Sequence, residues 1–270
     1  MRVREALNAA AGRLAEVSDT ARLDAELLMA HALGVEREAM LLHRLDDEAP
    51  AGFEPLVARR LAHEPIAYIT GRRAFWTIEL AVGPGVLVPR PDSETLIEAA
   101  IAYFGDRSPR RILDLGTGPG TLLLAALDQW PLATGLGVDA SEAALAYARR
   151  NIIPRAEFRL GDWGEGLDER FDLILCNPPY IEQGADLPRD VAGHEPAAAL
   201  YAGADGLDDY RRIAPQLVSL LAPSGVVCVE IGAGQSISTS ALFAAQGFTI
   251  ESRRDLRGIV RCLVLTRNRV

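Results

Sequence analysis

Apolar positions recur at helical spacing in the first quarter of the chain. Over residues 1–72 the pattern includes Leu23 and Leu27, with capping candidates at residues 18–20 and a helix stop at Gly34. This spacing is typical of amphipathic helices that bury one face, and glycine is the usual residue just after a helix end. We therefore expect a small N-terminal helical domain over residues 1–72, which begins directly with a helix.

The rest of the chain alternates short apolar runs with helical stretches. β-rich residues around Gly83-Pro84-Gly85 predict a hairpin over residues 75–88, so that residues 73–88 form a linker. A helix capped by Asp92-Ser93 is expected to reach Phe104. Strands are then expected near residues 111–115, 134–139, 156–160, 171–176, 225–231, 247–252 and 259–265, with helices between most of them.

This order of elements predicts an α/β fold. Strands that alternate with helices form parallel sheets, whereas the segment from Glu251 to Gly258 is too short for a helix, which makes the last two strands an antiparallel hairpin. Residues 89–270 are therefore expected to form one Rossmann-like domain with a seven-stranded, mostly parallel sheet. Residues 181–206 are expected to form a long loop, and long loops in compact domains are often functional.

A glycine-rich turn follows the first strand of this sheet. Its expected cofactor-binding residues are Gly116, Thr117, Gly118 and Gly120, because glycine lets the backbone approach a ligand and cofactors bind at the first strand-to-helix turn. The spacing weakens a dinucleotide-binding interpretation, since the third glycine of that fingerprint falls on Thr121. The chain contains no lysine, which excludes a phosphate-binding P-loop.

Carboxylates mark three of the expected strand ends. Asp139 is the expected ribose ligand, since a carboxylate accepts bonds from both ribose hydroxyls. Asp162 and Trp163 lie where an adenine would be placed, although Trp163 filling the core is an alternative. Asp114 is expected to bind the amino group of the cofactor through water or to shape the glycine turn.

The next strand ends in Asn177-Pro178-Pro179-Tyr180, which suits the binding of a planar NH2 group. The Asn177 side-chain carbonyl and the Pro178 backbone carbonyl can each accept one hydrogen, and Tyr180 offers a flat face. The prolines Pro178 and Pro179 stiffen the turn before anything binds. An ordinary Pro-Pro turn is the alternative for the tetrapeptide alone. The tetrapeptide follows the glycine turn and the two acids along the chain, and this order favours an amine-binding site beside a nucleoside cofactor. Asn177 is then expected to contact both the amine and the cofactor.

Taken together, these motifs resemble class I S-adenosylmethionine-dependent methyltransferases, and nearly the whole chain resembles the HemK/PrmC family of protein-(glutamine-N5) methyltransferases. The resemblance rests on residues 64–71 with Phe75-Trp76, residues 88–94, residues 114–118, residues 177–180, Glu195-Pro196, residues 205–207 and Tyr210-Arg211. Departures from the family pattern are Ala74, Ser93 in place of the usual threonine, Pro119 and His194.

The resemblance implies S-adenosyl-L-methionine as cofactor and S-adenosyl-L-homocysteine as product. It also implies that the substrate is the glutamine of the Gly-Gly-Gln loop in class 1 peptide chain release factors, gripped with the help of the N-terminal domain. Asn177, Pro178, Pro179 and Tyr180 are then the expected catalytic residues. Arg90 and Glu195 are further substrate-binding candidates, each with a structural alternative.

Other functions stay open at this stage. An N6-adenine or other nucleic-acid methyltransferase would present the same two hydrogens to Asn177, and a sibling enzyme acting on a ribosomal protein would share nearly all the motifs. A non-catalytic cofactor-binding module is disfavoured by the intact Asn177 and Tyr180. A formal net charge of −9 over 270 residues argues against stable binding to nucleic acid.

Composition adds few other sites. Cys176, Cys228 and Cys262 lie in apolar runs without zinc or disulfide spacing and are expected to be buried thiols, and the four histidines form no metal motif. No apolar stretch approaches the length of a membrane span, and the N-terminus does not resemble a signal peptide. We expect a cytoplasmic enzyme without a metal.

Overall fold

The computed structural model describes residues 1–267, which divide into two compact units. The smaller unit comprises Met1–Arg72 with two later segments, Val82–Pro84 and Leu187–Glu195. The larger unit comprises Arg73–Ala81, Gly85–Asp186 and residues 196–267. None of the helices within residues 1–267 has both the length and the apolar character needed to cross a bilayer.

The smaller unit is helical, as the apolar spacing predicted. Its helices are α1 (Val3–Leu14), α2 (Ala21–Leu33), α3 (Arg37–His43), α4 (Phe53–Leu61), α5 (Ile66–Thr70) and, from the later segment, α9 (Arg189–His194). Gly34 ends α2 in the left-handed conformation, with φ of 65°. The core also buries one ion pair, in which Arg60 Nε lies 2.8 Å from Asp24 Oδ2, so each buried charge is compensated.

The larger unit contains the predicted seven-stranded sheet, in the order β5-β4-β3-β6-β7-β9-β8. Only β9 runs antiparallel to its neighbours, so the predicted antiparallel hairpin at one side of the sheet is confirmed. The strands are β3 (Arg111–Leu115), β4 (Thr134–Asp139), β5 (Ala156–Leu160), β6 (Phe171–Cys176), β7 (Leu221–Glu230), β8 (Phe248–Arg254) and β9 (Val260–Arg267). The first four match their predicted bounds, whereas β7 begins four residues earlier than expected.

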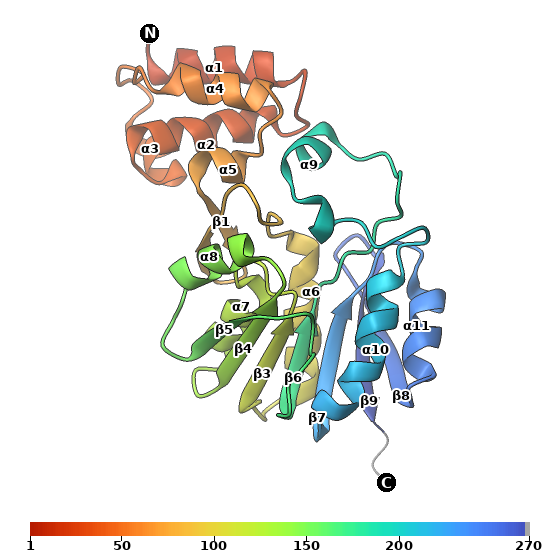
Figure 1. Cartoon of the computed structure of the whole chain (residues 1–270). Coiled ribbons are helices and arrows are strands. Elements are labelled where there is room, and N and C mark those ends of the chain that lie inside the picture. Colours follow the sequence, from red (N-terminus) through yellow and green to blue (C-terminus); the bar gives the residue numbers. More distant parts are fainter. Residues whose placement is uncertain (268–270) are drawn as a thin grey trace. The chain divides into compact units, whose positions relative to one another are not determined.

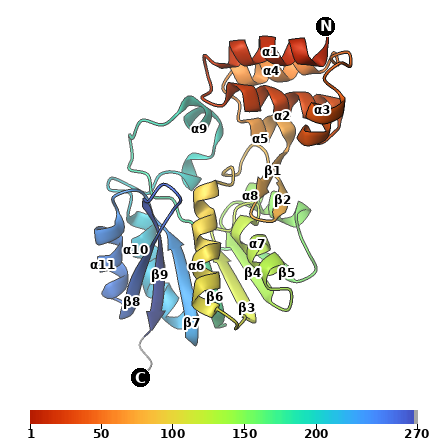
Figure 2. The same cartoon turned by 180° about the vertical axis from the view of Figure 1, so that it is seen from behind.

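Helices cover both faces of this sheet (Figures 1 and 2). α10 (Asp208–Leu220) and α11 (Ser236–Ala244) lie on one face, and α6 (Glu94–Phe104) and α7 (Thr121–Gln129) lie on the other. The remaining helix of the unit, α8 (Glu142–Arg150), connects β4 to β5.

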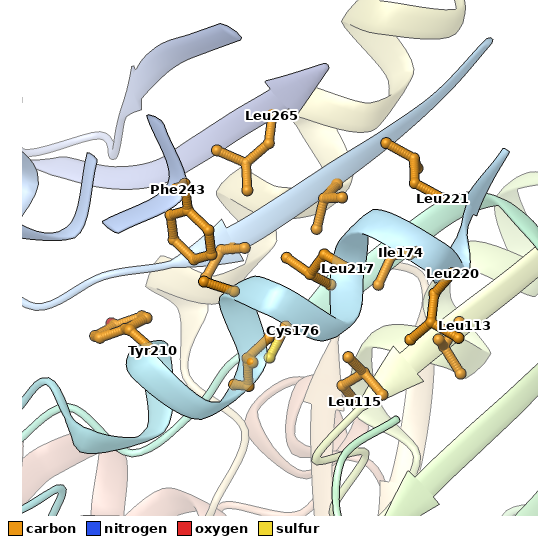
Figure 3. Packing of buried hydrophobic residues seen from close by; sticks show 14 of the residues in the cluster. Leu113, Leu115, Ile174, Cys176, Tyr210, Leu217, Leu220, Leu221, Phe243 and Leu265 are labelled. Atoms are coloured by element: carbon orange, nitrogen blue, oxygen red, sulfur yellow. The ribbon is translucent and has the colours of Figure 1, made fainter. Parts of the chain in front are cut away.

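Side chains from α10 and α11 pack onto the sheet in one continuous core (Figure 3). Leu217 and Leu220 of α10 meet the face of β3 and β6 that carries Leu115 and Ile174. Alternate strand residues point to opposite faces, so Asp114 of β3 faces α7 instead. All three cysteines are buried free thiols, as predicted.

The hairpin ahead of the sheet turns at a different place from the one predicted. β1 (Arg72–Phe75) and β2 (Ile78–Ala81) pair through a turn at Trp76 and Thr77, and Trp76 adopts φ of 54°. The Gly83-Pro84-Gly85 segment lies beyond the second strand. Proline cannot donate to a strand ladder, so the β-branched and aromatic residues before it form the pairing instead.

Candidate active site

A pocket opens at the carboxyl ends of β3 and β6, where the parallel strands of such a sheet bring their following loops together. It is lined by Leu87, Pro89, Arg90, Ser93, Asp114, Gly116, Thr117, Gly118, Pro119, Thr121, Leu122 and Asn177. Six of the predicted site residues therefore share one pocket: Arg90, Asp114, Gly116, Thr117, Gly118 and Asn177.

The glycine turn forms one wall of the pocket. Gly116, Gly118 and Gly120 all adopt the left-handed conformation, with φ of 71°, 57° and 91°. A Cβ added at Gly116 would lie 3.0 Å from the ring of Trp163, whereas one at Gly118 would meet no atom within 4 Å. The turn therefore combines a backbone bare of side chains with an indole ring packed against it, a shape suited to a flat ligand.

Asp139, at the end of β4, holds the glycine turn in place. Its two carboxylate oxygens accept hydrogen bonds from the backbone N–H groups of Gly118 and Ser141, each at 2.8 Å. Burial raises the pKa of Asp139, and these backbone bonds oppose that rise. Each oxygen keeps a further lone pair, so the carboxylate can still accept bonds from a ligand.

Asp114 is the most buried acid of the pocket. Its Oδ2 accepts hydrogen bonds from Thr117 Oγ1 at 2.7 Å and from the Leu123 backbone N–H at 3.1 Å, in the first turn of α7. Its Oδ1 is buried and has no hydrogen-bond partner within residues 1–267. Burial raises the pKa of Asp114 to about 7. An unpaired buried acceptor is costly, so this atom is suited to a ligand that brings a donor.

Asp162 and Trp163 differ in their surroundings. The Asp162 carboxylate is half-exposed and forms an ion pair with Arg212 of α10. The Trp163 ring packs against Gly116 and is partly buried beside the core. Burial raises the pKa of Asp209, and a hydrogen bond from Trp163 opposes that rise. The structure thus brings Trp163 to the glycine turn, while the side chain of Asp162 is engaged on α10.

Asn177 is held by a residue that the sequence analysis did not assign to the site. Its amide Nδ2 donates to Ser93 Oγ at 3.2 Å. Ser93 was expected to cap the following helix, but it makes no side-chain bond to the helix backbone and is buried instead against Asn177. Because the amide nitrogen faces Ser93, the amide oxygen Oδ1 faces away from it and can accept a hydrogen bond from a ligand.

Tyr180 reaches a second residue that was missed. Its hydroxyl donates to Oε1 of Glu230, the last residue of β7, at 3.3 Å. Its backbone carbonyl accepts a bond from Gln235 Nε2 at 2.9 Å. Burial raises the pKa of Glu230 to about 7, and burial together with the nearby Glu230 raises the pKa of Tyr180 above its usual range. The Asn-Pro-Pro-Tyr turn is therefore held at both ends.

The remaining predicted residues lie in different places. Pro178 is buried and Pro179 partly buried between Asn177 and Tyr180. Gly120 is the residue before α7 and does not line the pocket. Glu195 is buried at the end of α9 and belongs to the helical unit, so its part in substrate binding stays a prediction.

The chain is similar to known proteins over both its N-terminal part and its sheet. The PrmC N-terminal domain matches residues 5–71, and a methyltransferase domain matches residues 106–246. The 16S rRNA methyltransferase of T. thermophilus, whose structure contains AdoMet and guanosine, shares the fold with a TM-score of 0.54 at 21% identity. That match covers 73% of this chain and 50% of the rRNA enzyme.

Two curated relatives match along most of the sequence. The release factor glutamine methyltransferase of Rhodospirillum rubrum is 44% identical, over 91% of this chain and 79% of the relative. The enzyme of the same name from Caulobacter vibrioides is 41% identical, over 93% of this chain and 92% of the relative. With this identity along nearly its full length, the chain belongs to the family of release factor glutamine methyltransferases.

Proposed function

We propose that this protein transfers a methyl group from S-adenosyl-L-methionine to the glutamine nitrogen, N5, in the Gly-Gly-Gln loop of peptide chain release factors. The names of its relatives support the reaction and the substrate class. The observation that carries the proposal is the orientation of Asn177, whose amide nitrogen is bonded to Ser93 so that its oxygen is left for a substrate NH2 group.

The pocket fits the proposed cofactor. The unpaired Asp114 Oδ1 suits the cationic amino group at the methionine end, and Asp139 suits the ribose hydroxyls. Gly116 and Gly118 carry no side chain and allow close approach to the backbone of the turn, and the Trp163 ring offers a face for adenine. We assign Asp162 only a peripheral role, because its carboxylate is paired with Arg212.

The cofactor supplies a methyl group on a positively charged sulfur. The nucleophile is the glutamine amide nitrogen of the substrate, and it is a poor one because its lone pair is delocalised into the carbonyl. In our mechanism Asn177 Oδ1 and the Pro178 carbonyl each accept one hydrogen of the glutamine NH2 group. These two bonds fix the nitrogen with its lone pair directed at the methyl group.

The same two bonds favour the transition state. Positive charge grows on the glutamine nitrogen as the new bond forms, and hydrogen bonds to carbonyl oxygens strengthen with that charge. The rigid prolines keep both acceptors in place beforehand, and Tyr180 provides a flat surface for the amide plane. The acidified nitrogen then loses a proton to water, so no dedicated base is required.

Arg90 and Glu195 are the remaining substrate candidates. Arg90 lines the pocket beside Ser93, where a cation can close the site or orient a carboxylate. Glu195 lies in the helical unit, to which we assign the grip on the release factor. The partner implies a cytoplasmic site of action.

Methyl transfer from labelled donor tests this function. Purified protein is offered a class 1 release factor, a ribosomal protein and adenine-containing DNA, and the added methyl is located by mass spectrometry. We expect one methyl on the Gly-Gly-Gln glutamine and none on a release factor with alanine there. Methylation of the ribosomal protein or of adenine instead would replace the proposed substrate, and no transfer to any of the three would contradict the activity.

The pKa of Asp114 predicts how cofactor affinity depends on pH. In the free protein this buried carboxyl is half-protonated near pH 7, and only its ionised form pairs with an ammonium group. Protonation competes with binding, so the dissociation constant should fall about tenfold per unit as pH rises towards 7 and then level off. Calorimetric titration with S-adenosyl-L-homocysteine from pH 5.5 to 8 measures this. This dependence of affinity on pH should vanish in Asp114→Asn. A pH dependence that persists in that variant would have to come from another titratable group.

A further inference from the structure

Glu230 is a buried carboxyl that the mechanism above does not use. It is the last residue of β7, is 1% exposed, and lies beside the Asn-Pro-Pro-Tyr turn through its contact with Tyr180. Burial raises the pKa of Glu230, and the nearby Ser93 hydroxyl opposes that rise. The carboxylate oxygen Oε2 is buried and has no hydrogen-bond partner within residues 1–267. Glu230 therefore lies beside Ser93, which holds Asn177, and beside Tyr180 at the other end of the turn.

The ionised state of Glu230 determines which groups donate and which accept in these contacts. An ionised carboxylate can only accept, so the Ser93 proton must point towards Glu230. The Ser93 oxygen is then left to accept, and its partner is the Asn177 amide nitrogen at 3.2 Å. The carboxylate thus determines which end of the Asn177 amide faces Ser93 and which end faces the pocket.

We propose that Glu230 is a positioning residue, which fixes the Asn177 amide through Ser93 and the Tyr180 ring through its hydroxyl. This proposal rests on the proposed function of Asn177 as acceptor for the substrate NH2 group. If the Asn177 amide turned over, its own NH2 group would face the NH2 group of the substrate, and two donors would meet. The negative charge of Glu230 prevents that turn.

Other charged groups surround Glu230. Arg261 of β9 stabilises the carboxylate, Asp92 ahead of α6 opposes its ionisation, and the Tyr180 hydroxyl bonds it. Tyr210 of α10 donates its hydroxyl to the Glu230 backbone carbonyl at 2.8 Å, not to the carboxyl. Cys176 and Cys262 are buried nearby, and burial raises the pKa of each thiol, so both stay neutral.

Two substitutions test the chain of contacts. Glu230→Gln keeps the shape but brings a donor, and Ser93→Ala removes the link to Asn177. We expect each to lower kcat about tenfold, the effect of one lost hydrogen bond, while the dissociation constant for S-adenosyl-L-homocysteine changes less than twofold. In the double variant the losses should not add, because both act through the same contacts. Additive losses, or a matching loss of cofactor affinity, would overturn the proposal.

Conservative variants separate positioning from a general structural role. Ser93→Thr keeps the hydroxyl and should retain kcat within about threefold of the wild type. This measurement tests the proposal even if Glu230→Gln folds poorly. Tyr210→Phe removes only the bond to the Glu230 backbone, so it should lower thermal stability without changing kcat. A Ser93→Thr variant as slow as Ser93→Ala would contradict the proposal.

The pH profile provides an independent readout. At saturating cofactor, kcat of the wild type should fall below about pH 7 as Glu230 becomes protonated, and this acidic limb should disappear in Glu230→Gln. An unchanged limb in that variant would exclude Glu230 as its origin. Failure of the wild type to methylate release factors would instead remove the function on which the proposal rests.

Discussion

Replacing Asn177 by alanine is expected to slow methyl transfer by about 10²–10³-fold, the usual cost of losing one preorganised hydrogen-bonding group at a reacting centre. The Asn177 oxygen accepts a hydrogen from the substrate nitrogen, and this bond strengthens as charge develops there. Without it the glutamine NH2 group keeps one acceptor and is free to rotate. Single-turnover rates with purified release factor and saturating labelled donor measure the effect.

Cofactor affinity provides the internal control for this variant. The acids and the glycine turn that we assign to the cofactor are held by bonds that do not involve the Asn177 side chain, as the contacts of Asp114 and Asp139 illustrate. The dissociation constant for S-adenosyl-L-homocysteine should therefore change by no more than a few fold. An equal loss of rate and affinity would mean that Asn177 shapes the cofactor pocket and does not act on the substrate amide.

Much of this site could be predicted because parallel strands bring their carboxyl ends to one edge. Glycines after β3, Asp139 after β4 and Asn177 after β6 are each visible as polar or flexible residues directly behind an apolar run. The fold then places them together without further information from the sequence. The same rule applies to Glu230, a charged residue that ends the apolar run of β7. Its position at that strand end could have identified this carboxyl as a site residue.

Contacts made by side chains from distant segments were not predictable in this way. Ser93 stands before a helix and follows an aspartate, so its local pattern is that of a helix cap, yet its hydroxyl bonds Asn177, which is 84 positions away in the sequence. Asp162 follows a strand like the other acids, but Arg212 reaches it from α10. In each case the partner is chosen by packing, which the pattern of a single segment does not contain.

The hairpin shows a different limit. Gly83-Pro84-Gly85 carries the strongest local turn signal, whereas the real turn uses Trp76 at positive φ, a conformation that tryptophan seldom adopts. Tertiary contacts stabilise it: the Trp76 backbone N–H donates to Glu94 at 2.9 Å, and Asn151 bonds both backbone groups of Ala81. Local propensity was overridden by bonds to helices elsewhere in the larger unit.

Replacing Asp114 by asparagine is expected to weaken cofactor binding about 10²-fold, the size of a lost charge-assisted hydrogen bond. The change is nearly isosteric, but the surroundings determine how the new amide lies. Thr117 Oγ1 and the Leu123 N–H both donate to Oδ2, so the amide oxygen must stay at that position. The new NH2 group then takes the place of Oδ1 and presents a donor to the cationic amino group of the cofactor.

The stability of the Asp114→Asn variant should not fall along with its cofactor affinity. Because burial raises the pKa of Asp114 to about 7, ionisation in the folded state is unfavourable. The stability that the neutral carboxyl gives below pH 4 is lost as pH rises through 7. At pH 8 the asparagine variant carries no buried charge and should unfold no more easily than the wild type. Reduced affinity with undiminished thermal stability is therefore the expected signature, measured by calorimetric titration and thermal unfolding.

A matched control separates this contact from a general loss of negative charge. Asp128 lies near the end of α7, is exposed, and accepts a hydrogen bond from the Thr77 hydroxyl of the hairpin at 2.6 Å. Asp128→Asn removes the same charge from the same helix region and should leave cofactor affinity within twofold. If both variants lost affinity equally, the effect would be long-range electrostatics, and the assignment of Asp114 to the cofactor amino group would be wrong. If neither variant lost affinity, the unpaired Oδ1 of Asp114 would have to bind a different ligand.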